Sequence, residues 1–122
     1  MDTINIVETI VKALDAKRAE DINVLHVTDL TILADYFVIA DGTSVTQTKA
    51  LADEVEYQVS VNCEGRKPNS VQGEPNGGWV ILDYGDIVVH VFYKEQRDFY
   101  NLDKLWADGE SVDISSWIIK EN

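Results

Sequence analysis

Two apolar runs joined by a short turn constrain this 122-residue chain more than any other feature. Residues 79–83 (WVILD) and 86–92 (DIVVHVF) flank the dipeptide Tyr84-Gly85. Two such runs separated by a two-residue loop that ends in glycine are typical of a tight β-hairpin. Because a loop of this length fixes the register of the strands, the sequence also predicts which side chains share a face.

In the predicted register, Asp83 lies opposite Asp86 and Trp79 lies opposite His90. One face then carries only aliphatic side chains, and we expect helices to cover it. Its members are Val80, Leu82, Ile87, Val89 and Val91. The other face carries aromatic, aliphatic and ionisable side chains together. Its members are Trp79, Ile81, Asp83, Asp86, Val88, His90 and Phe92.

The mixed chemistry of this second face favours a protein interface. An apolar centre with aromatic anchors and a polar rim is the usual composition of protein docking surfaces. The alternative is that the last helix or the C-terminal tail of the same chain covers this face. His90 has no nearby His or Cys that could complete a metal site, so we expect it to supply a hydrogen bond in an interface or in the core.

The remaining sequence predicts helices at the period of 3.6 residues and short β-rich runs. Helices are expected at 3–18, 45–63 and 94–107, and further strands at 22–28 and 36–40. The fold is therefore a single α/β domain (an α+β mixed sheet) of order α-β-β-α-β-β-α, with helices mainly on one face. The second helix should connect strands 36–40 and 79–83 as a parallel pair. Residues 64–78 hold both prolines and four of the seven glycines, and so long a connection is expected to be functional or mobile.

The charge balance narrows the class of partner. Ten basic and 22 acidic side chains give a formal net charge of −12. Nucleic-acid binding depends on Lys and Arg that neutralise phosphates, so direct RNA or DNA binding is disfavoured. The acidic residues are explained by solubility alone, or by a partner with a basic protein surface.

Other features indicate a reducing compartment. The chain has one cysteine, Cys63, which we expect to be a buried thiol. The sequence has no apolar run of the ~20 residues that a membrane span needs, and its start lacks the character of a signal peptide. We expect a complete, cytoplasmic, bacterial-type chain.

A catalytic interpretation has one starting point in Gly42-Thr43-Ser44, between a predicted strand and a predicted helix, where nucleotidyltransferases hold phosphate. However, Ser44-Val45-Thr46-Gln47 fits a helix capping box, which explains the same serine structurally. Metal-dependent transfer also needs a pair of carboxylates, and the nearest pair is Asp83 and Asp86. No nucleophile–base pair or Cys/His cluster accompanies them, so we expect no enzyme, no cofactor and no bound metal.

Several motifs resemble the ribosomal silencing factor (Iojap/RsfS-like) family. The resemblance is carried by residues 35–40 (DYFVIA), Gly42-Thr43-Ser44 and the whole hairpin 79–92. It continues through Glu95, Arg97, Phe99-Tyr100, Leu102 and Leu105-Trp106. The match extends over about residues 4–108, which predicts a family domain at 1–108 followed by a tail at 109–122 of unassigned role.

The resemblance implies a nucleotidyltransferase-like fold without the catalytic carboxylates. It also implies binding to large-subunit ribosomal protein L-fourteen, a steric block to subunit joining, repression of translation and a homodimer when free. The predicted partner-binding residues are Trp79, Asp83, Tyr84, Asp86, His90 and Phe92. Two alternatives stay open: a metal-dependent nucleotidyltransferase or nucleotide-binding domain using Gly42, Ser44 and Asp83, and a generic dimerisation module whose Trp79 face pairs with itself.

Overall fold

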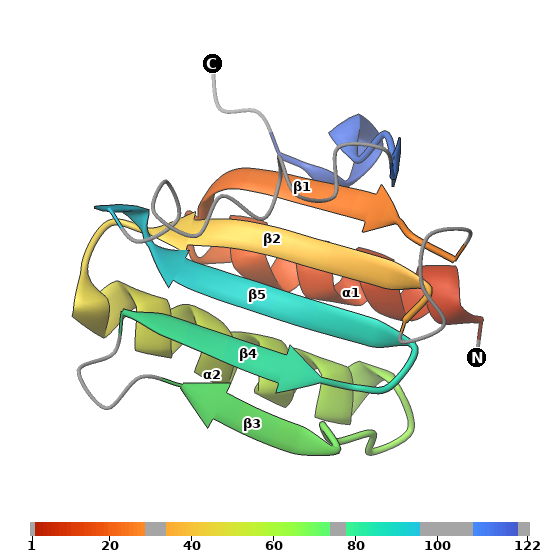
Figure 1. The fold of residues 1–122 in the computed structure, drawn as a ribbon. Helices are drawn as coiled ribbons and strands as arrows, with labels where there is room; N and C mark the ends of the chain where they lie inside the picture. Colours follow the sequence, from red (N-terminus) through yellow and green to blue (C-terminus); the bar gives the residue numbers. More distant parts are fainter. Residues whose placement is uncertain (1, 29–33, 74–77, 96–108, 120–122) are drawn as a thin grey trace.

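The computed structural model describes residues 2–28, 34–73, 78–95 and 109–119. These segments form a six-stranded mixed sheet with two helices packed against one of its faces (Figure 1). The helices are α1 (Thr3–Ala16) and α2 (Val45–Asn62). The strands are β1 (Glu20–His26), β2 (Tyr36–Gly42), β3 (Ser70–Gly73), β4 (Trp79–Asp83), β5 (Ile87–Tyr93) and β6 (Glu110–Ser111). A short 3-10 helix, η1 (Ser115–Trp117), lies in the tail.

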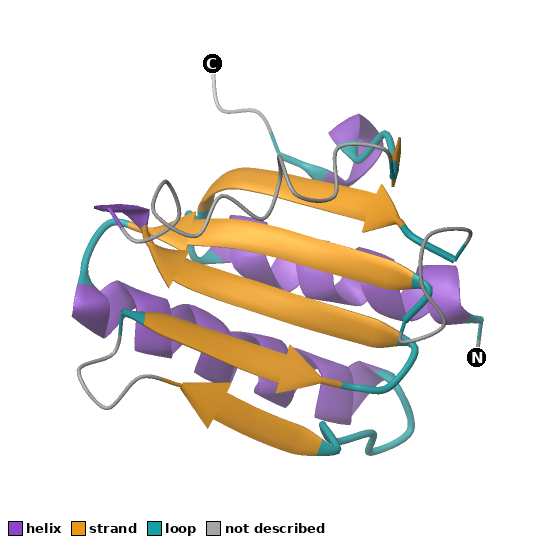
Figure 2. Cartoon of the chain, viewed as in Figure 1, coloured by secondary structure: helices purple, strands orange, loops and turns teal. Residues whose placement is uncertain are grey.

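The predicted class, a small mixed sheet with helices on one face, is confirmed. Figure 2 shows α1 and α2 side by side behind the sheet. Their apolar stripes and the inward side chains of the strands form one core, in which most members are fully buried. The core includes Val7, Ile10, Leu14, Val38, Leu51, Val55, Val59, Leu82, Ile87, Val89 and Val91. Cys63 lies at its edge as a buried free thiol, as the sequence predicts.

The strand order β3-β4-β5-β2-β1-β6 corrects one part of the predicted topology. The strand parallel to β2 is β5, whereas β4, at residues 79–83, is antiparallel to β5 and so to β2. The physical reason is that β5 is the longer and more apolar strand of the hairpin, with buried side chains on both faces. A strand of that kind is most stable in the middle of a sheet. The connection from β2 to its parallel partner β5 therefore contains β3 and β4 as well as α2.

Two strands, β3 and β6, were not predicted from the sequence. β3 lies within the proline- and glycine-rich stretch 64–78 and contains only one β-branched residue, Val71. β6 is two residues long and pairs with β1. Such short strands depend on their neighbours for stability, and their own sequence carries almost no signal.

The described part of the tail packs against the domain. Val112, Ile114, Trp117 and Ile118 are partly buried against the main core, and the backbone N–H of Ile119 donates to the Asp15 carboxylate. The predicted helix at 94–107 falls largely on residues outside the described ranges. Among the described residues, no helix is long and apolar enough to cross a membrane.

Candidate functional site

The hairpin predicted from sequence is present, but its turn is shifted by one residue. The two-residue loop is Gly85-Asp86, closed by a hydrogen bond from the Tyr84 N–H to the Ile87 carbonyl. Gly85 has a φ of 90°, while Asp86 is not in the positive-φ region. Glycine at the first central position is the pattern of a type II′ turn, whereas the prediction placed it second.

The shift moves the pairing of the two strands by two residues. Trp79 lies opposite Phe92, Ile81 opposite His90 and Asp83 opposite Val88. Because side chains alternate with a period of two, a shift of two keeps each side chain on its predicted face. The division of the two strands into an aliphatic and a mixed face is therefore right, although the predicted cross-strand partners are wrong.

The aliphatic side, which we call the helix face, is covered by α1 and α2. Leu82, Ile87, Val89 and Val91 are all 0% exposed there. Tyr84 belongs to this face as well and is 2% exposed. Burial raises the pKa of Tyr84 to about 12, with a smaller effect of the same sign from Glu56 and an opposing one from Arg66. Tyr84 thus lies on the opposite face from Trp79, and its position does not support the predicted contact with a partner.

The other side, which we call the aromatic face, combines residues of β4 and β5 with residues of β2. From the hairpin it contains Trp79, Ile81, Asp83, Val88, His90 and Phe92, and from β2 it contains Phe37, Ile39 and Asp41. Neither α1 nor α2 lies on this face (Figure 1). This face therefore combines aromatic, aliphatic and ionisable side chains, as predicted from the sequence.

Burial on the aromatic face changes from the centre of the sheet towards β4. Phe37, Ile39 and Phe92 on the central strands are buried, and His90 is only 8% exposed. Trp79, Ile81 and Asp83 on β4 are half-buried, as is Val88 opposite Asp83. His90 and Phe92, which were predicted to contact a partner, therefore lie beneath the accessible surface, and the accessible part of the predicted site is its β4 side.

His90 occupies an aromatic environment. Its ring meets Phe37 edge-on with centroids 5.1 Å apart and stacks parallel to Phe92 at 6.3 Å. Within the described residues, neither ring nitrogen has a hydrogen-bond partner. Burial lowers the pKa of His90 to about 4, and the Asp83 carboxylate opposes this shift. The imidazole is thus held neutral at pH 7.

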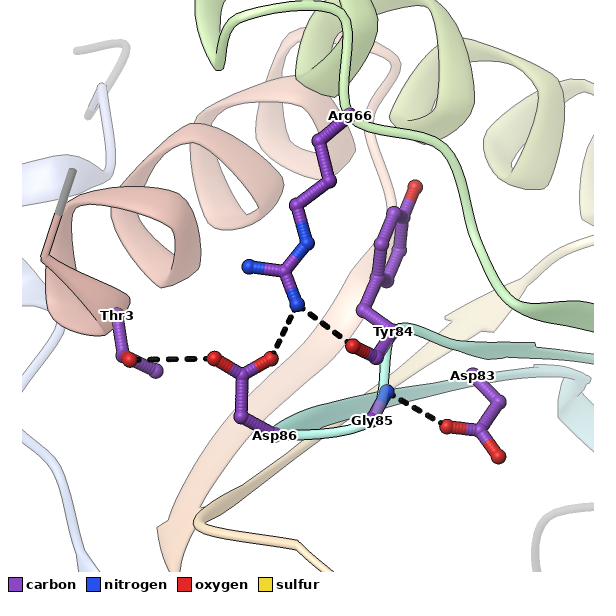
Figure 3. Close-up of polar contacts among 6 residues, drawn as sticks. All are labelled: Thr3, Arg66, Asp83, Tyr84, Gly85 and Asp86. Atoms are coloured by element: carbon purple, nitrogen blue, oxygen red, sulfur yellow. Dashed lines mark hydrogen bonds and ion pairs between the residues drawn. The ribbon is translucent and has the colours of Figure 1, made fainter.

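The two acids of the turn do not form a pair. Asp83 accepts a hydrogen bond from the Gly85 N–H at 2.8 Å, and no ion pair to it occurs within the described residues. Asp86 instead forms an ion pair with Arg66, and its second oxygen accepts a hydrogen bond from the Thr3 hydroxyl at 3.2 Å. Figure 3 shows the two carboxylates on opposite sides of the turn. The predicted pairing of Asp83 with Asp86 across the hairpin is therefore wrong, because Asp86 is a loop residue rather than a strand residue.

The Arg66 guanidinium also donates to the Tyr84 carbonyl at 2.6 Å (Figure 3). One side chain thus fastens the connection after α2 to the hairpin turn, while Thr3 fastens the start of α1 to the same carboxylate. Sequence reasoning missed this role of Arg66, and no local pattern indicates it, since Arg66 and Asp86 are 20 residues apart.

The residues of the catalytic alternative have structural roles. Ser44 is the N-cap of α2, and its hydroxyl accepts a hydrogen bond from the Gln47 N–H at 3.0 Å. Gln47 in turn accepts from the Thr43 N–H and hydroxyl. A Cβ at Gly42 would lie 2.5 Å from the Thr48 hydroxyl and 2.9 Å from its backbone nitrogen. Gly42 is therefore explained by the close approach of β2 to α2, and Ser44 by capping.

No three His, Cys, Asp or Glu side chains gather as a potential metal site in the part of the chain that the structure describes. Asp83, the third residue of the catalytic alternative, is on the far side of the hairpin from Asp86 and has no second carboxylate in the turn with which to hold a cation.

Sequence comparison identifies relatives along the whole chain. Residues 1–122 match the profile of a family described as "Ribosomal silencing factor during starvation". A ribosomal silencing factor of Bacillus subtilis is 40% identical over 114 residues, which are 93% of this chain and 95% of that protein. Its counterpart in Halalkalibacterium halodurans is 35% identical over 97% of this chain and 99% of that protein.

Two solved structures share the fold over most of the chain. A crystal structure of a Chromobacterium violaceum protein superposes with a TM-score of 0.83 at 32% identity, and the match covers 94% of this chain and 93% of that one. A Bacillus halodurans crystal structure superposes with a TM-score of 0.78 at 33% identity, covering 91% of this chain and 99% of the other. The sequence match reaches residue 122 and so includes the tail that the resemblance seen from sequence left unassigned.

Proposed function

Because this chain belongs to the ribosomal silencing factor family, we propose that it represses translation by binding the large ribosomal subunit through ribosomal protein L-fourteen and blocking attachment of the small subunit. The observation that carries the proposal is the family match over residues 1–122. The role of such a factor is regulatory rather than catalytic, and it acts in the compartment that contains the ribosomes.

The mechanism requires occupancy alone. Two bodies cannot fill the same site, so the inhibition of joining follows the fraction of large subunits that carry the factor. Each ~1.4 kcal/mol of lost binding free energy lowers the affinity tenfold. The net charge of −12 suits a basic ribosomal protein as the partner, since opposite charges accelerate the encounter and disfavour wrong partners.

We assign the docking surface to the accessible, β4 side of the aromatic face. Trp79 and Ile81 offer half-buried apolar area, and Val88 adds to it across the hairpin. Asp83 has no ion pair within the described residues, and a Lys or Arg of the partner would supply one. Beneath them lies His90, whose two ring nitrogens have no hydrogen-bond partner among the residues that the structure describes. A polar group of the docked protein that reached this ring would form a hydrogen bond with it.

The test is co-sedimentation of Trp79→Ala with purified large subunits. Removal of an aromatic anchor from the centre of an interface costs about 2 kcal/mol or more, or roughly a 30-fold loss of affinity. Val61→Ala is the control, because it truncates an apolar side chain that is 62% exposed on α2, away from this face. Co-sedimentation of Trp79→Ala at the level of the parent protein would contradict the assigned surface.

A homodimer of the free protein, which the family resemblance implies, is part of the same proposal. We expect the aromatic face to be buried between the two copies, so that the dimer must dissociate before binding. Sedimentation velocity of the parent and of Trp79→Ala measures this directly. A dimer that persists unchanged in Trp79→Ala would place the contact between copies on another surface.

A further inference from the structure

A second accessible surface lies at the far edge of the sheet, where β3 is the last strand in the order β3-β4-β5-β2-β1-β6. Val71 is 53% exposed there, and Gln72 and Gly73 are exposed as well. Within the described ranges, no strand pairs with the outer side of β3. Alternate residues of such an edge strand point their N–H and C=O groups away from the sheet, where another chain can pair with them.

A groove follows this edge between β3 and α2. It consists of two adjoining hollows of about 300 and 470 Å³, and Glu56 and Val71 line both of them. Tyr57, at 61% exposure, and Pro68 add apolar area to one hollow, and Val80 adds to the other. The groove therefore places an apolar floor beside an open strand edge.

The charged side chains that line the groove indicate which kind of partner it would bind. Asp53 and Glu56 lie three residues apart on α2, and neither has an ion pair within the described residues. Burial and the neighbouring Asp53 raise the pKa of Glu56, because its charge is partly desolvated and not neutralised. Lys49 and Lys67 lie at the two ends of the groove, beside the end and the start of β3 respectively. The middle of the groove is thus acidic and its ends are basic.

From these observations we propose that the outer edge of β3 binds an extended, basic segment of a partner protein, which adds a seventh strand to the sheet and places its cations against Asp53 and Glu56. The spacing fits this mode. Residues three apart on a helix have Cβ atoms about 5–6 Å apart, and residues two apart on a strand are separated by about 6.6 Å. Two basic side chains at alternate positions of the added strand therefore meet the two carboxylates.

A second copy of the chain suits this edge less well. Each copy carries a net charge of −12, so two copies repel each other. Pairing of β3 with itself about a twofold axis would also bring the acidic centre of one groove towards the acidic centre of the other. A basic segment removes the unneutralised charge, whereas a second copy doubles it.

The experiment uses a defined probe, the peptide acetyl-Thr-Val-Arg-Val-Arg-Val-Thr-amide carrying a fluorophore, and measures its anisotropy with the full chain. The comparison is between Asp53→Lys/Glu56→Lys and the control Glu8→Lys/Glu64→Lys. Both double variants change the formal net charge equally, from −12 to −8, but the control places the lysines outside the groove. A probe with both arginines replaced by glutamate tests the sign of the charge.

We expect saturable binding of the arginine probe, at least a tenfold loss in Asp53→Lys/Glu56→Lys, and affinity in the control within about threefold of the parent. The glutamate probe should bind better to Asp53→Lys/Glu56→Lys than to the parent, and hydrogen exchange at residues 70–73 should slow when the arginine probe is bound. Equal losses in both double variants would show general charge attraction and overturn the proposal, as would no saturable binding at millimolar probe. A dimer in sedimentation velocity that Val71→Lys dissociates would assign the edge to a second copy instead.

Discussion

The two faces of the central hairpin differ in composition and in how they are closed. The helix face is aliphatic, and two helices of the same chain cover it so completely that Leu82 and Val89 are 0% exposed. The aromatic face carries Trp79, His90 and Asp83, and its burial decreases from the middle of the sheet towards β4. Both faces are apolar in bulk, so hydrophobicity alone does not distinguish the core from the surface that we propose for docking. The distinction lies in the aromatic and ionisable groups and in the unequal covering.

The largest expected effect comes from truncating neighbouring residues of β4 that point to opposite faces. Leu82→Ala removes a fully buried side chain and leaves a cavity, which should cost about 2–5 kcal/mol of unfolding free energy. Ile81→Ala removes a half-buried side chain from the aromatic face and should cost about 1 kcal/mol. Chemical denaturation of both variants measures the difference. Equal costs would show that the two faces are closed to the same degree.

The same two variants should have the opposite order in binding. Among molecules that remain folded, Ile81→Ala should weaken co-sedimentation with large subunits and Leu82→Ala should leave it unchanged. If Leu82→Ala is the variant that loses binding, the docking surface has been placed on the wrong side of the hairpin.

The second effect is a pH dependence of stability that arises on the aromatic face. Because His90 has a pKa of about 4 in the fold against 6.5 in the unfolded chain, the unfolded state takes up more protons below pH 6.5. Stability should therefore fall as the pH drops from about 6.5 to about 4, by up to about 3 kcal/mol at the lower end. The variant His90→Leu, which has no proton to bind, should flatten the unfolding free energy in this window. A parent and variant with the same slope would show that His90 is accessible to water in the fold.

The smallest effect separates the two acids that flank the turn. Asp86→Asn weakens the ion pair to Arg66 and should cost about 1–2 kcal/mol of stability, without changing the affinity for large subunits. Asp83→Asn should leave stability within about 0.5 kcal/mol and should slow association with large subunits in low salt. Thermal unfolding and stopped-flow binding of the two variants test this division. The reverse assignment of effects would mean that Asp86, rather than Asp83, faces the partner.

The parts of the fold that could be predicted from sequence depend on local periodicity. Helical spacing locates α1 and α2 to within two residues at each end, and the alternation along β4 and β5 assigns side chains to the correct faces even though the register is off by two. The face assignment survives because an even shift preserves the alternation. A shift of one residue would have exchanged core and surface.

The parts that could not be predicted depend on contacts between distant residues. The pairing of β2 with β5 rather than β4 depends on which hairpin strand is inserted in the sheet, and the alternation of apolar residues along the hairpin does not indicate which one. The separation of Asp83 from Asp86 has two causes. The turn lies one residue later than predicted, and Arg66, from the connection after α2, forms an ion pair with Asp86. The burial of His90 depends on side chains of two further strands, which no pattern near residue 90 reveals.

We propose that this chain prevents subunit joining by occupying the large subunit. The most direct test mixes purified small and large subunits by stopped flow, follows joining by light scattering, and varies the concentration of this protein. We expect the joined fraction to fall in proportion to the fraction of large subunits that carry the protein. Trp79→Ala should shift the binding curve and the inhibition curve together to higher protein concentration. Normal joining by large subunits that are saturated with the protein would contradict it.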